Sequence, residues 1–143
     1  MWHFYVRGGI AYVPKVLKTD VGFFLDSDPV AVIPLADAER LIDTLVTAIR
    51  NGNEGGKAPA RHEYGMPVVA RAAGVSDWST FARTARLFRI RQTESGYEIA
   101  AMGRASDGAW SERRFGDRVE HVTAGPTEAA RRLVAKAVQE TFN

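Results

Sequence analysis

The chain has 143 residues, enough for one domain whose hydrophobic core needs no metal or disulfide to hold it together. Hydrophobic residues make up 45% of the chain and charged residues 25%, which argues against extensive disorder. The net charge is only +2 and there is no cysteine, so a polyanionic partner is not required and disulfides and thiolate metal sites are excluded.

The first residues do not resemble an export signal. MWHFYVRGGI lacks a basic region followed by a long apolar stretch. The longest charge-free apolar stretch near the front is PVAVIPLA at 29–36, which is far too short to cross a bilayer. We therefore expect a cytoplasmic protein without a membrane partner.

The first third of the chain predicts strands. WHFYVRG at 2–8 alternates aromatic and β-branched residues, which is typical of a strand that ends at a glycine turn. VGFFL at 21–25 and VAVIPL at 30–35 predict two buried strands. A turn is expected between them at Asp26–Pro29, because Asp, Ser and Pro all favour turns.

A helix and a long loop are expected next. Asp37 is the predicted N-cap of a helix with apolar residues at helical spacing, and Asn51–Gly52 is its predicted stop. Residues 51–65 hold four glycines, a proline and almost no apolar residue. We therefore expect a flexible loop at about 51–65.

The middle of the chain changes its period from helical to alternating. MPVVARAAGV at 66–75 fits either a strand or a short helix, and Ser76 can cap a helix that carries Trp78 and Phe81 on one stripe. From Leu87 onward the period is two, as in an antiparallel meander. The expected strands of this meander are 87–93, 97–104, 109–115 and 118–123.

The end of the chain predicts a helix that begins at Pro126 and Thr127. Together these elements predict an α+β fold, a mainly antiparallel sheet with about three helices gathered on one side. Because there is no internal repeat and no clean boundary, residues 1–143 are expected to form a single domain.

Three aspartates, Asp20, Asp26 and Asp28, flank the apolar runs of the first third. Asp26 and Asp28 are spaced so that both can face one way, as a metal or catalytic site requires. Calcium loops, however, have more oxygen ligands and a characteristic glycine. Turn and strand-end positions account for all three aspartates without a ligand, so we expect no metal here. An acidic face for a basic partner stays open, since residues 20–43 hold six acids against Arg40 alone.

The residues that commonly carry catalysis are scattered. His3, His62 and His121 lie on a first strand, a loop and a late strand, without an H-E-x-x-H motif. GVSDW at 74–78 departs from the G-x-S-x-G elbow at Trp78. We therefore expect no catalytic residue and no enzyme. The alternative is a small enzyme in which His3 or His121 meets a carboxylate only in the folded chain, in a deep pocket.

A basic run follows the predicted helix at Trp78. Its four arginines lie within nine residues, without an acid between them, at Arg83, Arg86, Arg89 and Arg91. Arginines beside strand aromatics can bind single-stranded RNA. A half-buried strand gives the same pattern, with Phe88 and Ile90 facing the core and Arg89 and Arg91 facing water.

Several segments together resemble the immunity proteins of bacterial contact-dependent growth inhibition systems. The segments are YVPKVLKTDVGFFLDSDPVAVIPL at 12–35, AIRNGN at 48–53, MPVVARAAGVSDWSTFARTARLFRIRQTESGYEIAA at 66–101 and the closing helix. The similarity is one of segment order and wording over most of the chain, most clearly at Pro67-Val68-Val69, Trp78-x-x-Phe81 and Tyr97-x-Ile99.

The resemblance implies a cytoplasmic antidote that binds the toxic C-terminal domain, often a nuclease, of a delivered effector. Such a protein needs no catalysis, no cofactor and no specific nucleic acid. A toxin that grips RNA usually presents a basic cleft, so we expect an acidic binding surface. Charge clustering alone predicts its residues: Asp20, Asp26, Asp28, Glu54 and Glu63. The alternative function is an RNA-binding module that uses Arg83–Arg91.

Overall fold

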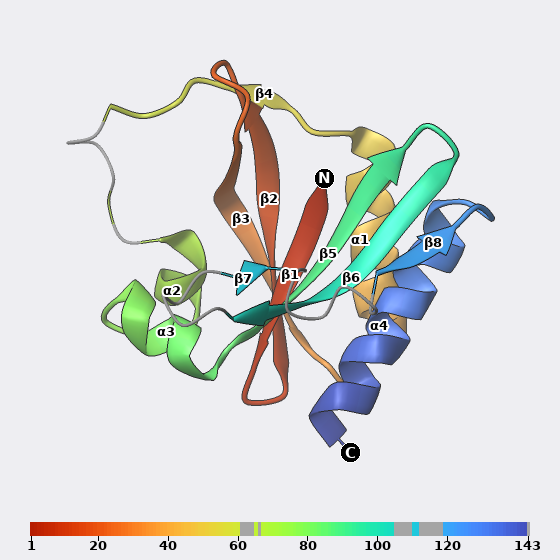
Figure 1. Cartoon of the computed structure of the whole chain (residues 1–143). Coiled ribbons are helices and arrows are strands. Elements are labelled where there is room, and N and C mark those ends of the chain that lie inside the picture. Colours follow the sequence, from red (N-terminus) through yellow and green to blue (C-terminus); the bar gives the residue numbers. More distant parts are fainter. Residues whose placement is uncertain (61–64, 66, 105–109, 112–118, 143) are drawn as a thin grey trace.

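One mainly antiparallel sheet forms the centre of the fold (Figure 1). The structure, a computed structural model, describes residues 1–60, 65, 67–104, 110–111 and 119–142. The strands lie side by side in the order β3 (Phe24–Pro34), β2 (Ile10–Thr19), β1 (Trp2–Arg7), β5 (Arg86–Thr93) and β6 (Gly96–Arg104). Two short strands, β7 (Trp110–Ser111) and β8 (Glu120–Val122), pair with β6, and β4 (Gly55–Gly56) pairs with β2. The predicted α+β fold with a mainly antiparallel sheet is confirmed.

The β2–β3 hairpin turns earlier than the sequence predicts. The amide and the hydroxyl of Thr19 both donate to the carbonyl of Phe23, and Gly22 between them has a φ of 95°. The predicted turn at Asp26–Pro29 is therefore wrong, because β3 runs straight through it. The register shifts at this point, where Pro14 pairs with Val30 and Lys15 with Ser27. A bulge thus absorbs the turn-forming Asp28–Pro29 without ending the strand.

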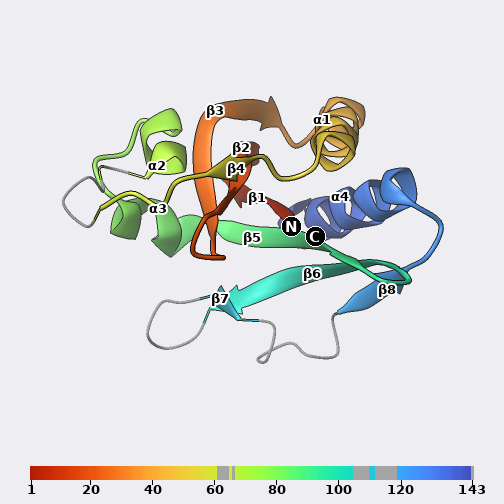
Figure 2. The ribbon, with the colours of Figure 1, turned by 90° about the horizontal axis from the view of Figure 1, so that it is seen from above.

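Four helices are present among the described residues: α1 (Ala38–Asn51), α2 (Val68–Ala72), α3 (Trp78–Thr84) and α4 (Pro126–Phe142). They do not gather on one side. Helices α1 and α4 pack on one face of the sheet, and α2 and α3 lie against the other (Figure 2). The reason is visible on β1, where Phe4 joins the first core and its neighbour Tyr5 joins the second. Both faces of the central strand are apolar, so both are covered.

The larger of the two cores lies between the sheet and α1 and α4. The rings of Phe4 and Phe88 stack in it with centroids 5.3 Å apart, and both side chains are fully buried. Leu41 of α1 and Leu133 of α4 are also fully buried there. Burial of Phe88 together with Ile90 confirms the buried strand face that the alternation on β5 predicts.

The N-cap of α3 and the order of the last strands differ from the expectations. The N-cap of α3 is Asp77 rather than Ser76: its carboxylate accepts a 2.7 Å hydrogen bond from the amide of Thr80. That hydrogen bond lowers the pKa of Asp77. The ambiguous segment at 66–75 contains the short helix α2. Strand β8 pairs with the start of β6 and β7 pairs with its end, so the last strands are not a simple meander.

Candidate functional site

The five predicted contact residues lie in different surroundings. Asp20 is exposed at the β2–β3 turn, where its carboxylate accepts from the amide of Ala58. Glu54 lies at the same end of the sheet, beside β4, and pairs with Lys15. Asp28 pairs with Arg71 of α2 at the surface. Asp26 is largely covered, and Glu63 lies outside the described residues.

Strands β1 and β2 pair only near their shared turn and then separate. The ladder joins Tyr5–Arg7 to Ile10–Tyr12 and stops there. Asn53 bridges the two strands beyond this point: its side-chain amide donates to the carbonyl of Met1 at 2.8 Å and to that of Val16 at 3.0 Å. We call the gap between the separated parts of β1 and β2 the opening. One cavity lies on each face of the sheet beside it.

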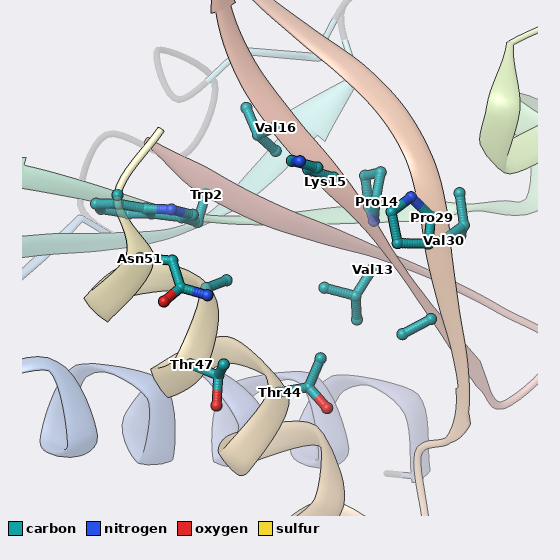
Figure 3. A pocket seen from close by; sticks show the side chains of 13 residues that line it. Trp2, Val13, Pro14, Lys15, Val16, Pro29, Val30, Thr44, Thr47 and Asn51 are labelled. Carbon is teal, nitrogen blue, oxygen red and sulfur yellow. The ribbon is translucent and has the colours of Figure 1, made fainter. Parts of the chain in front are cut away.

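The first cavity, of about 420 Å³, lies between the opening and α1. Figure 3 shows Thr44, Thr47 and Asn51 of the helix facing the strand residues across it, with the ring of Trp2 closing one side. Trp2 is buried, and its indole nitrogen has no hydrogen-bond partner among the described residues. The other strand residues at its wall are mostly apolar.

The second cavity, of about 490 Å³, lies on the opposite face of the sheet and contains the strongest chemical arrangement of the described chain. Nε2 of His3 lies 2.5 Å from Oδ1 of Asp26, and the hydroxyl of Tyr5 donates to Oδ2 of the same carboxylate at 2.7 Å. His3 and Tyr5 are both more than nine-tenths buried. All three side chains line the cavity.

The positions of His3, Tyr5 and Asp26 follow from the strand order. His3 and Tyr5 are two residues apart on β1, so their side chains share the face that α2 and α3 cover. Asp26 reaches them from β3, across the opening between β1 and β2. The aromatic rings of Trp78 and Phe81 contact Tyr5 edge to face, at 5.8 and 5.6 Å between centroids, and fix its ring.

Burial keeps the hydroxyl of Tyr5 protonated. Burial, with the adjacent charge of Asp26 as a second cause, raises the pKa of Tyr5 well above its ordinary value. Tyr5 is therefore a permanent hydrogen-bond donor and Asp26 the acceptor. At 2.5 Å from a carboxylate oxygen, Nε2 of His3 must also donate, because two lone pairs at that distance repel. Neutral His3 then carries its lone pair on Nδ1.

The raised pKa of Tyr5 predicts a loss of stability in alkali. Above about pH 10 the unfolded chain releases the phenolic proton while the folded chain keeps it. The unfolded state then binds fewer protons, so the free energy of unfolding falls as the pH rises. Urea unfolding measured from pH 8 to about pH 11 is expected to show a shallower decline in Tyr5→Phe. Tyr97→Phe, which removes a hydroxyl from β6, is the control, and equal declines in both variants would contradict the expectation.

The other two histidines are His121 and His62. His121 is exposed on β8, with Nδ1 3.8 Å from a carboxylate oxygen of Glu98. His62 lies outside the described residues. Within the described part of the chain, no cluster of three metal-ligating side chains occurs. No helix of the described residues is long and apolar enough to span a membrane.

The basic run is divided by the fold. Arg86 pairs with Glu140 of α4 at 3.1 Å, and Arg91 pairs with Glu98 on the neighbouring strand. Arg89 lies opposite His3 in the β1–β5 register, on the face away from Phe88. Arg83 belongs to α3. The four arginines therefore do not form one continuous basic stripe, and RNA binding stays a prediction without further support.

Comparisons with known proteins relate the chain to others by fold alone. No family model and no curated protein matches the sequence. A solved structure, described as a protein of unknown function, NMB0488, from Neisseria meningitidis, is similar with a TM-score of 0.58 and 11% sequence identity. The match covers 94% of this chain and 92% of that one. The two folds are therefore similar over almost the whole chain, but the match does not assign an activity.

Proposed function

We propose that the chain is a cytoplasmic immunity protein that binds the C-terminal toxin domain of a contact-dependent growth inhibition effector. The proposed binding surface, which we call the hairpin tip, consists of Asp20–Phe23 with Glu54 beside it. This protein acts by covering the toxin and carries out no reaction of its own in doing so.

One observation carries this proposal: exposed apolar side chains are concentrated on the β2–β3 hairpin. Of the four large hydrophobic residues that are exposed among the described residues, three lie there: Val21, Phe23 and Val32. Val21 is 68% exposed and Phe23 is 40% exposed, both in the turn. Apolar and aromatic side chains that are exposed together are typical anchors of protein interfaces.

The charged residues around the hairpin tip suit the rim of a protein interface rather than its buried centre. Asp20 and Glu54 are exposed there, next to the apolar pair. Acids at the edge of an interface speed the capture of a basic partner and are screened by salt. Asp26 is four-fifths covered, and Asp28 pairs with Arg71 of α2 rather than lying at the turn, so we place both outside the proposed surface. The toxin as partner is supported by the resemblance of the segments at 12–35 and 66–101.

We expect the gene next to this one to encode a large exported protein, and the test uses the C-terminal toxin domain of that protein. Co-expression of the intact chain is expected to restore growth to cells that make this domain, and the two purified proteins are expected to form a complex. The double variant Val21→Ser, Phe23→Ser is expected to weaken the complex by about 100-fold or more, because two apolar anchors are lost.

The matched control is Phe142→Ser, which removes an exposed phenylalanine (59%) from the far end of α4. It is expected to bind and protect like the unaltered chain. Absence of a complex with the toxin domain would refute the function itself. A complex that the double variant forms with unchanged affinity would refute only the hairpin tip as its site.

A further inference from the structure

We propose that the second cavity is a binding site for a small ligand with a planar apolar body and a hydroxyl or N–H group, and that Nδ1 of His3 accepts the hydrogen bond from that group. The site lies on the face of the sheet covered by α2 and α3. It is separate from the hairpin tip, and the proposal does not depend on toxin binding.

The walls of the cavity set the body of the ligand. Trp78, Phe24 and Leu25 supply aromatic and aliphatic surface on the sides away from the polar cluster. A volume of about 490 Å³ is in the range that small-molecule sites in proteins occupy. Sites of this kind combine apolar walls with a few fixed polar groups, and here those groups are His3, Tyr5 and Asp26.

The hydrogen bonds of the cluster set the polar group of the ligand. Both carboxylate oxygens of Asp26 are engaged, one by Tyr5 and one by Nε2 of His3. The hydroxyl of Tyr5 donates its only proton to Asp26. Nδ1 of His3 makes no hydrogen bond with any described residue. Nδ1 is therefore a carboxylate-supported imidazole nitrogen that can accept from a donor group of a ligand.

Burying the carboxylate of Asp26 costs solvation free energy. A carboxylate that is four-fifths buried loses solvation, and it is stabilised only while both partners stay in place. Apolar side chains of similar size would fill the same space without that cost. A histidine held in one tautomer at the wall of a cavity is the usual arrangement for recognising or accepting a proton.

The test compares two probes that differ in a single group, phenol and fluorobenzene. Both have the planar body, and only phenol can donate a hydrogen bond. In two-dimensional NMR spectra of the intact chain, both are expected to shift the indole resonance of Trp78. Phenol is expected to bind about fivefold more tightly, which corresponds to one net hydrogen bond.

The matched variant is His3→Phe, which keeps a planar ring at the wall of the cavity but removes both ring nitrogens, Nδ1 included. We expect it to bind fluorobenzene like the unaltered chain and to lose the preference for phenol. The Val21→Ser, Phe23→Ser variant is expected to keep that preference. Equal affinities for the two probes, no shift of Trp78 with either probe, or a preference that survives in His3→Phe would each overturn the proposal.

A second measurement keeps the test valid if His3→Phe does not fold. Long-range nitrogen–proton NMR spectra of the unaltered chain report which ring nitrogen of His3 carries the proton. The proposal requires Nε2–H, and it requires phenol to move the Nδ1 resonance more than fluorobenzene does. A proton on Nδ1 in the neutral ring, or an Nδ1 resonance that phenol leaves in place, would overturn it.

Discussion

Phe88→Ala is expected to lower the free energy of unfolding by about 3–5 kcal/mol. Phe88 is fully buried in the larger core, and its ring stacks on Phe4 at an interplanar angle of 20°. It lies on β5 between Phe4 of β1 and Ala101 of β6, so its loss opens a cavity in the middle of the sheet. Neighbouring strands cannot move in to fill that space without breaking their ladders. Urea unfolding followed by circular dichroism measures the change.

Phe142→Ala is the matched control for the loss of a phenyl ring. Its side chain is 59% exposed near the end of α4, and removal is expected to change the free energy of unfolding by less than about 0.5 kcal/mol. The slope of the unfolding free energy against urea should be the same in both variants, so that the midpoints report stability. A loss below about 1.5 kcal/mol in Phe88→Ala would mean that the core relaxes around this site.

The elements that the sequence predicts well are those whose pattern is local. Phe88 and Ile90 alternate with Arg89 and Arg91 because one face of β5 is buried, and this can be read from four adjacent residues. The closing helix is equally clear, since Ala130, Leu133 and Ala137 recur at helical spacing within one segment. Neither needs knowledge of any distant part of the chain.

The features that the sequence misses depend on pairing between distant segments. The turn predicted at Asp26–Pro29 fails because the ladder with β2 continues past it, and the local preference for a turn costs less than the lost pairing would. The division of the helices between two faces depends on β1 being a central strand, apolar on both sides. Its sequence, WHFYVR, is apolar on both faces, but the need for helices on both faces follows only once β1 is known to be a central strand.

The cluster of His3, Tyr5 and Asp26 shows the same limit at the level of a site. Alternation along β1 places His3 and Tyr5 on one face, and that much is available from the sequence. Asp26 joins them because β1 and β2 separate and β3 lies beyond. Asp20, Asp26 and Asp28 appear equivalent in the sequence, yet one is exposed at the turn, one is covered and one pairs with Arg71 at the surface.

Asp26→Ala is expected to lower the free energy of unfolding by about 2–4 kcal/mol, because it removes the carboxylate that accepts from two buried donors. The donors are the hydroxyl of Tyr5 and Nε2 of His3, which lie 2.7 and 2.5 Å from its oxygens. Addition of Tyr5→Phe to Asp26→Ala is expected to recover part of the loss, since one of these two buried donors is then absent. Urea unfolding of the two single variants and the double variant gives this coupling directly.

Asp28→Ala, two residues along the same strand, is the control. It tests whether the loss of stability in Asp26→Ala comes from the burial of the carboxylate or from the loss of its charge. Asp28 is 63% exposed in its pair with Arg71, so its removal is expected to cost less than about 1 kcal/mol. Both substitutions remove one carboxylate from β3, and both residues point toward α2 and the second cavity's side of the sheet. Equal losses in Asp26→Ala and Asp28→Ala, or losses in Asp26→Ala and Tyr5→Phe that simply add, would mean that the two hydrogen bonds to Asp26 do not stabilise the fold as the geometry requires.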